Sequence, residues 1–288
     1  MIDFSKHFIP ERFTPLWHTP SYAGMTPAQR LTYNQLYAMI VNEQIVLFET
    51  ALASAVLGKC IAVGVPDTLA HRLRVFIADE ARHTEMFRRL NRLAAPGYYA
   101  NSDWHFIRLP PALTLSLTWA TRRSSLAPAF LMLMLLEEER SLYLSNGYRQ
   151  EASSLEPAFV EVHHRHFTDE TRHVDCDESL LTLLWSGASR ARRTYNARLF
   201  GWLIREFFSA PKRGGVRVLD ELAVRHPEIG TELRRMKREQ RALGGDGPYL
   251  CSLFSREIAP RTFAQFDRMP GLSGLGRWLP GYTPATEA

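Results

Sequence analysis

Cysteine is scarce in this 288-residue chain, and the chain has no long apolar run. The three cysteines, Cys60, Cys176 and Cys251, match no disulfide or zinc-binding spacing, which favours a reducing compartment. The longest uninterrupted apolar stretch, Ala129 to Leu136, is far shorter than a membrane span. The N-terminus also lacks the apolar core of a signal peptide. We therefore expect a cytoplasmic protein without a membrane partner.

Linkers and blocks of one charge are missing as well. No Gly/Ser-rich stretch divides the chain, and 45% of its residues are apolar, so we expect one domain with appended segments. The net charge of +5 comes from arginines scattered through helices that also carry acids. This pattern is typical of solvated helix surface and not of a nucleic-acid interface. Part of the charge is available to attract an anionic substrate or an acidic redox partner.

What the chain does contain is the pattern Asp-Glu-x-Arg-His, twice, 90 residues apart. In dinuclear four-helix bundles, a Glu-x-x-His from each of two helices and a Glu from each of the other two converge in the core. A single copy would more often mark a solvated helix face with a half-buried histidine, but a repeated copy favours a metal site. The first copy comprises Asp79, Glu80, Arg82 and His83, and the second comprises Asp169, Glu170, Arg172 and His173.

A shift of the sequence by 90 residues also selects two further carboxylates. Glu49 falls on Glu139, and each lies 31 residues before the Glu of its repeated pattern. By the same test Glu43, Glu137 and Glu138 have no acidic counterpart. Oxygen and imidazole ligands without thiolate suit iron or manganese, and four carboxylates balance two divalent cations. The repeat thus predicts a dinuclear site held by Glu49, Glu80, His83, Glu139, Glu170 and His173.

The spacing predicts two antiparallel helical hairpins, because their midpoints fall at turn-forming residues. These are Gly64-Val65-Pro66, followed by Asp67 as an N-cap, and Ser153-Ser154. We expect an all-α, ferritin-like four-helix bundle over residues 28–186, between an extended N-terminal arm and a C-terminal helical cover. The predicted bundle helices are 27–60, 67–94, 111–148 with an interruption near Pro128, and 156–186. The arm is 1–27, and the cover (187–288) holds helices near 188–209, 216–242 and 256–268.

Asp79 and Asp169 each precede a ligand glutamate, so they point about 100° away from it, toward the neighbouring helix. We expect each to accept a hydrogen bond from the second ring nitrogen of a ligand histidine on the facing helix. Such a bond would fix the tautomer and the orientation of the ring. The alternatives are surface pairs with Arg82 and Arg172, or a buried network that these arginines complete.

These residues resemble those of the AurF-type diiron N-oxygenases, the p-aminobenzoate N-oxygenase family. The resemblance runs from about Asn42 to Glu178 and rests on Glu49, Glu139, both repeated patterns, and a histidine, His166, four residues before the second motif glutamate. It implies two irons, O2 as co-substrate and an external electron donor of the ferredoxin or reductase type. It further implies a peroxo-diferric species that oxidises a small-molecule amine, such as an arylamine, to a hydroxylamine, nitroso or nitro product in a biosynthetic pathway. We expect the enzyme to be a homodimer.

His166 has no counterpart in the first half, because the 90-residue shift places it on Phe76. On a helix it lies within about 40° of Glu170 and His173, so it faces the metals. The resemblance identifies it as a third imidazole ligand, and the alternative is a core histidine satisfied by hydrogen bonds. His163, one turn farther, is expected to lie behind the ligands or to serve packing.

Other proteins use the same kind of centre. The paired pattern is also similar to that of bacterial hydrocarbon monooxygenases, so a hydroxylase or desaturase is an alternative. Ribonucleotide reductase small subunits resemble the chain less, because the position of their radical tyrosine is Phe87 here. A non-catalytic iron-binding or ferroxidase protein is a further alternative. Iron storage would require a closed cage of many subunits, which the long terminal segments disfavour.

Overall fold

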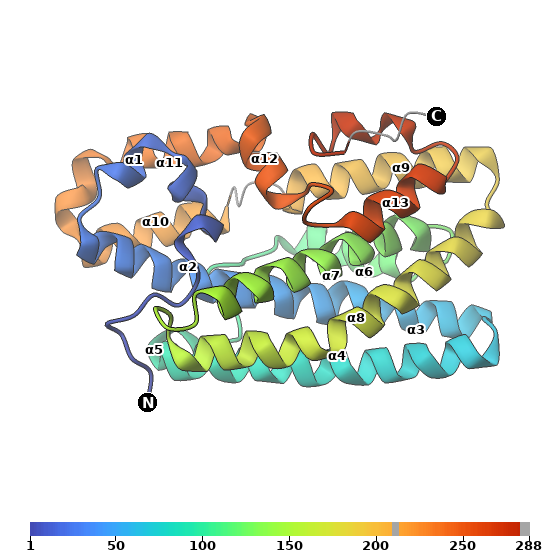
Figure 1. Cartoon of the computed structure of the whole chain (residues 1–288), viewed down its shortest axis with the longest axis horizontal. Coiled ribbons are helices and arrows are strands. Elements are labelled where there is room, and N and C mark those ends of the chain that lie inside the picture. The colour runs from blue at the N-terminus through green and yellow to red at the C-terminus, as the bar shows by residue number, and fades with distance from the viewer. Residues whose placement is uncertain (209–212, 283–288) are drawn as a thin grey trace.

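The computed structural model describes residues 1–208 and 213–282, and these residues form helices and turns without a β-strand (Figure 1). The all-α prediction is therefore confirmed. The long helices lie lengthwise beside one another, and α8 contacts both α4 and α7. The elements of the bundle are α2 (Pro27–Leu47), α3 (Ser54–Val63), α4 (Asp67–Ala94), α7 (Ala127–Gln150) and α8 (Pro157–Ser186).

The first bundle helix begins at a capping box. The Thr26 side chain accepts a hydrogen bond from the Gln29 amide, and the Gln29 side chain accepts one from the Thr26 amide. The helix continues beyond α2 through a π-helical turn, Phe48–Ala53, into α3. Such turns often occur at functional sites, and this one carries Glu49.

The turn between α3 and α4 lies where the sequence predicts it. Gly64 has a φ of 97°, a conformation that favours glycine because a side chain there is strained. The predicted cap by Asp67 is wrong, because Pro66 occupies the N-cap position and no side chain caps the helix. Asp67 lies instead in the first turn, where its negative charge still favours the positive end of the helix dipole.

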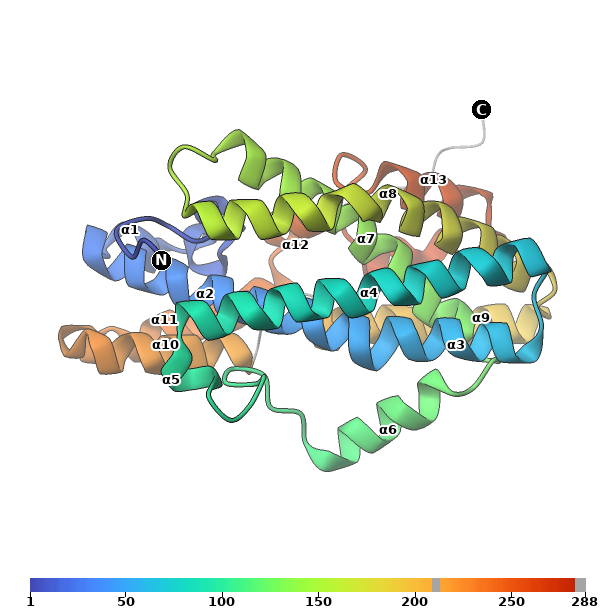
Figure 2. The same ribbon diagram turned by 90° about the horizontal axis from the view of Figure 1, so that it is seen from below.

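The helix predicted over 111–148 is two helices in the structure, α6 (Pro111–Thr121) and α7. The break comes before Pro128, which lies in the first turn of α7, where a missing amide hydrogen costs nothing. Figure 2 shows that α6 lies apart from the bundle. The Glu156 side chain accepts hydrogen bonds from the amides of Ala158 and Phe159 and so caps α8.

The terminal segments wrap the bundle. The arm over 1–27 is not extended as predicted but folds into short turns and α1 (Pro20–Ala23), because its prolines begin helical turns. The segment predicted as helical near 216–242 is divided in the structure, and the helix predicted near 256–268 begins only at Pro260. Residues 209–212 lie outside the described part of the chain. The remaining helices are α5 (Pro96–Tyr99), α9 (Arg190–Leu203), α10 (Gly214–Arg225), α11 (Leu233–Ala242), α12 (Gly247–Leu253) and α13 (Pro260–Arg268).

The apolar core consists of two clusters, one at each end of the bundle. Along α4, Phe76 belongs to the first cluster and Leu90 to the second, and the Glu80 and His83 motif lies between them. A buried polar band thus separates the two apolar regions.

One helical segment, Pro27–Val63, is long and apolar enough to cross a membrane by length and composition alone. Core helices of soluble proteins pass the same test, and this segment carries the buried carboxylates of Glu43 and Glu49.

Candidate metal centre

Two glutamates lie between two histidines at the centre of the buried band. Glu80 Oε1 lies 3.7 Å from His83 Nδ1 and 3.2 Å from His173 Nδ1. The Glu170 oxygens lie 3.6 Å and 3.5 Å from the same two nitrogens. Ligands of one metal ion, each about 2 Å from it, lie about 3 Å apart. Glu80 and Glu170 are therefore placed to hold metal together with both histidines.

An outer carboxylate stands on each side of this central group. Glu49 Oε1 lies 3.9 Å from His83 Nδ1, and Glu138 Oε2 lies 3.9 Å from His173 Nδ1. The predicted Glu139 is not near these groups. Its carboxylate accepts hydrogen bonds from the backbone amides of Arg261 and Thr262 at 3.0 Å and 2.6 Å, and so caps the first turn of α13. The 90-residue shift therefore selected the wrong acid, and Glu138 takes the place predicted for Glu139.

Three consecutive acids of α7 point in three directions, because successive helical residues are rotated by about 100°. Glu137 pairs with Arg140 at 3.0 Å, Glu138 faces His173, and Glu139 caps α13. The constant 90-residue shift fails at these acids because the two hairpins differ in helix type and in the length of their connections. The first has a π-helical turn and a connection of residues 64–66, whereas the second has a connection of residues 151–156.

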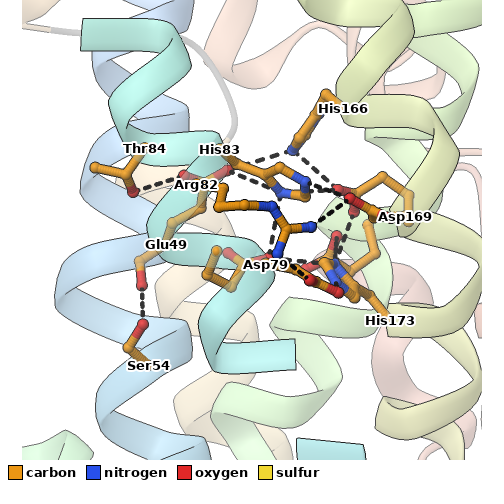
Figure 3. Close-up of polar contacts among 12 residues, drawn as sticks. Glu49, Ser54, Asp79, Arg82, His83, Thr84, His166, Asp169 and His173 are labelled. Atoms are coloured by element: carbon orange, nitrogen blue, oxygen red, sulfur yellow. Dashed lines mark hydrogen bonds and ion pairs between the residues drawn. The ribbon is translucent and has the colours of Figure 1, made fainter. Parts of the chain in front are cut away.

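His166 lies in the site, as the sequence predicts, beside the Glu49 end (Figure 3). Its Nε2 is 3.3 Å from Glu49 Oε1 and 2.9 Å from Glu170 Oε1. His163 lies outside the cluster. Its ring stacks on Tyr148 at 3.9 Å, and burial lowers its pKa to about 3, so it is a neutral packing residue.

The two aspartates bond to histidines of the opposite hairpin. His83 Nε2 lies 3.1 Å from Asp169 Oδ2, and His173 Nε2 lies 3.4 Å from Asp79 Oδ2. These are the bonds that the sequence predicts, and they leave each Nδ1 free to face the carboxylates. Arg82 and Arg172, each exposed for 59% of its side chain, both pair with the two aspartates. The arginines therefore tie the network together at the surface (Figure 3).

Electrostatics in the metal-free cluster are unfavourable. Burial, together with the charge of Glu80, raises the pKa of Glu49 well above its usual value. Burial alone would lower the pKa of His173, but hydrogen bonds and the charges of Glu170 and Glu80 raise it to about 11. Both carboxylate oxygens of Glu80 and of Glu170 are buried without a hydrogen-bond partner, and so is the Nδ1 of His173. Buried polar atoms normally have partners, so the donor set fits bound metal cations.

Distances within the cluster divide it into two groups that could each hold a metal ion. In each group the candidate donor atoms lie within 4.8 Å of one another. All these residues are buried. The first group is Glu80, His83, Glu170 and His173, and the second is Glu49, His83 and His166.

Two residues that position the metal-binding side chains are not apparent from the sequence motifs. The Thr84 hydroxyl donates a hydrogen bond to Glu49 Oε2 at 2.8 Å, and its position next to His83 was the only available signal. The Phe76 ring stacks on His173 at 3.8 Å and fixes the plane of that ring. Aromatic packing of this kind has no motif, so only the fold reveals it.

A cavity of about 100 Å³ reaches the cluster from one side. Glu49, Glu80, Glu138 and His166 form its inner end. Its outer part is largely aromatic and includes Phe13, Tyr37, Phe48, Tyr143 and Tyr249. The charged residues Glu137, Arg140 and Arg12 also line it, but Glu137 pairs with Arg140 and Arg12 pairs with Glu151. The cavity therefore gives a small, mainly apolar molecule access to the metal-binding residues.

Comparison with known proteins agrees with this arrangement. No curated protein sequence matches the chain. The model of the family "P-aminobenzoate N-oxygenase AurF" matches residues 2–243, which include every residue of the cluster. This match covers most of the 288 residues, and the chain therefore belongs to the AurF family.

Proposed function

We propose that this protein is an O2-dependent non-haem diiron oxygenase that transfers oxygen to the nitrogen of an arylamine. The observation that carries the proposal is the buried cluster of carboxylates and imidazoles with unpartnered oxygens, at the end of an aromatic cavity, in a chain of the AurF family. When bound, two irons would supply the redox chemistry that makes O2 an oxidant for the amine. The residues that would hold them are Glu49, Glu80, His83, Glu138, His166, Glu170 and His173.

The chain's own groups orient and shield this centre. Asp79 and Asp169 hold the tautomers of His173 and His83, so that each Nδ1 faces the carboxylates. The hydroxyl of Thr84 holds one oxygen of Glu49 and leaves the other directed into the cluster. The apolar clusters on both sides limit access by water, and water would compete for the oxidant.

The cavity favours a neutral aromatic amine. Aromatic side chains line it, and the guanidinium of Arg140 is already paired with Glu137 and lies over the Phe254 ring. A substrate carboxylate would have to break that ion pair to gain a partner. Unprotonated arylamines, whose nitrogen lone pair is available, suit this surface better than charged alkylammonium groups.

The reaction requires electrons from outside. Formation of a hydroxylamine follows RNH2 + O2 + 2 e⁻ + 2 H⁺ → RNHOH + H2O, so a reductant must deliver two electrons in each turnover. We infer that a ferredoxin or reductase type of protein serves this role, that the enzyme acts as a homodimer, and that it works in the cytoplasm. Sedimentation of the iron-loaded protein checks the dimer, and a large closed assembly would favour iron storage instead.

The test is isotopic. Iron-loaded, reduced protein is mixed with ¹⁸O2 and a panel of arylamines, and the products are analysed by mass spectrometry. We expect ¹⁸O on nitrogen. Product ¹⁸O on carbon, or an alkene from an alkyl substrate, would identify a hydroxylase or desaturase. Accumulation of ferric ion without any organic product would identify a ferroxidase. Glu138→Ala is the control, because it alters the cluster and leaves the outer part of the cavity intact.

A further inference from the structure

A second, larger cavity lies beside the metal centre, between the bundle and α6. Its volume is about 630 Å³, within the range of small-molecule sites. Its walls are α2, the π-helical turn Phe48–Ala53, the segment after Ile107, α6, and the end of α9. Most of its lining is apolar, and it includes Leu52, Leu113, Leu117 and Trp202. Figure 2 shows α6 on the outer side, spanning this region.

The charged groups of this cavity are three arginines and Glu206, and Glu206 is paired with Arg205 at 3.0 Å. Arg108, Arg213 and Arg217 all line it. All three face one cavity, and burial together with the charges of Arg108 and Arg213 lowers the pKa of Arg217. Arg217 donates to the carbonyl of Phe106, but in residues 1–208 and 213–282 no hydrogen bond or ion pair engages the side chains of Arg108 and Arg213. Repelling guanidinium groups beside an apolar cavity favour an anion.

The loop that carries Arg108 is held rigidly. Glu43, fully buried, accepts hydrogen bonds from the amides of His105, Phe106 and Ile107. The hydroxyl of Tyr99 donates to the same carboxylate at 2.7 Å. A loop fixed in this way presents Arg108 in a defined position, as a binding site requires.

Only a thin partition separates the two cavities. Gln44, Phe48 and Phe208 line both of them, and the rings of Phe48 and Phe208 meet edge to face at 6.1 Å. Each phenylalanine lies at the end of a π-helical turn, Phe48–Ala53 or Ile204–Phe208. Such turns have weaker hydrogen-bond geometry than α-helix and often mark functional positions.

We propose that this cavity binds an organic anion with an extended apolar body. The anionic group lies at Arg108 and Arg213, and the apolar body points along the cavity to the Phe48 and Phe208 partition. Carboxylates and phosphates share the required chemistry. On the proposed function, an arylamine at the far end of such a body would reach the metal centre through the partition, so the cavity would set the substrate class.

Binding is tested first, on the iron-loaded protein, with dansylaminoundecanoate as the fluorescent probe. Dodecanoate, dodecyl phosphate, dodecanol and dodecylammonium then compete with it. We expect the two anions to displace the probe at concentrations about tenfold or more below those for dodecanol, and dodecylammonium to compete least. The relative strength of dodecanoate and dodecyl phosphate identifies the preferred head group. Equal competition by dodecanol and dodecanoate would overturn the proposal.

Variants locate the site. Arg108→Gln with Arg213→Gln should weaken probe binding by about 10- to 100-fold. The matched control, Arg74→Gln with Arg89→Gln, removes the same charge from exposed positions of α4 and should leave binding unchanged. Ser116→Trp should block the cavity from α6 while iron content and Tm stay near those of the parent protein. Equal binding by both double variants would refute the assignment.

Activity then separates this inference from the proposed function. Arylamines tethered by a long alkyl chain to a carboxylate are compared with short neutral arylamines. We expect the Arg108 and Arg213 double variant to raise KM for the tethered amines by about tenfold or more, with kcat little changed and short amines unaffected. Tight binding of tethered amines without N-oxygenation would refute the proposed function, but it would still support the assignment of the cavity as an anion site. Normal N-oxygenation without anion binding would refute the cavity assignment and leave the proposed function supported.

Discussion

Glu138 and Glu139 are adjacent in the chain, yet Glu138 faces His173 and Glu139 caps a helix. Glu138→Ala should therefore lower the iron content and abolish amine oxidation. Glu139→Ala should retain iron but lower the free energy of unfolding by about 1–3 kcal/mol, since two amides of α13 lose their acceptor. Metal analysis and denaturant unfolding of both variants check this. Loss of iron in Glu139→Ala alone would restore the repeat-based assignment.

His166 and His163 provide a matched pair on one helix. His166→Ala should leave the protein folded but reduce amine oxidation by about 10- to 100-fold, because one imidazole that faces Glu49 and Glu170 is lost. His163→Phe should leave activity unchanged, since the neutral ring only packs against Tyr148. Steady-state rates and the iron content of both variants test this prediction. Normal turnover in His166→Ala would make that residue structural.

Asp79 and Asp169 act through the histidines that they contact. Asp169→Asn should weaken iron binding by about 10- to 100-fold, since an amide holds the His83 tautomer less strongly than a carboxylate. Competition with a chelator measures the change. Asp175→Asn, on the same helix and outside the cluster, is the control. Unchanged iron affinity in Asp169→Asn would mean that the aspartate serves only the surface pairs with the arginines.

Spacing alone identified most of the cluster, because a Glu-x-x-His on a regular helix has one geometry. It identified Glu80, His83, Glu170 and His173 as a group that lies together. It failed at Glu138, since the choice among three neighbouring acids depends on small differences in turn length and helix type. Thr84 and Phe76 could not be found either, because neither residue type marks a metal site.

At the scale of elements, helix starts were predictable wherever proline or a capping side chain marks them. Thr26 at α2 and Pro157 at α8 are examples. The π-helical turn could not be predicted from the sequence, because no residue type in Phe48–Ala53 requires it. The gap between α6 and α7 was predictable, because Pro128 marks the interruption, and it lies in the first turn of α7.

Glu43 links α2 to the crossing loop through one carboxylate. Glu43→Ala would leave the amides of His105, Phe106 and Ile107 without their acceptor, so the free energy of unfolding should fall by about 3 kcal/mol or more. Iron content should stay near that of the parent protein, because the residue is outside the cluster. Thermal unfolding and metal analysis test this. Iron loss without destabilisation would contradict it.

At the scale of the whole molecule, the candidate metal-binding residues come from four helical elements of two hairpins. Removal of iron by a chelator should therefore lower Tm, since bound ligand stabilises the native state by about 4 kcal/mol at a thousandfold excess over Kd. Scanning calorimetry with and without the chelator measures the shift. The same chelator should not change the Tm of Glu138→Ala. An equal Tm for the iron-loaded and iron-free protein would show that iron binds the native state no more tightly than the unfolded chain.

The reciprocal hydrogen bonds relate the two halves of the chain as two copies would be related in a dimer. In a symmetric dimer, whenever one residue touches a second on the partner, the second touches the first in return. Here Asp79 bonds His173 as Asp169 bonds His83, and Phe76 lies against His173 as His166 lies against His83. The two halves thus make, within one polypeptide, the reciprocal contacts that a hairpin would make with its own copy. Because the halves are not identical, one can carry a histidine at 166 where the other carries a phenylalanine at 76, a difference that two identical subunits could not have.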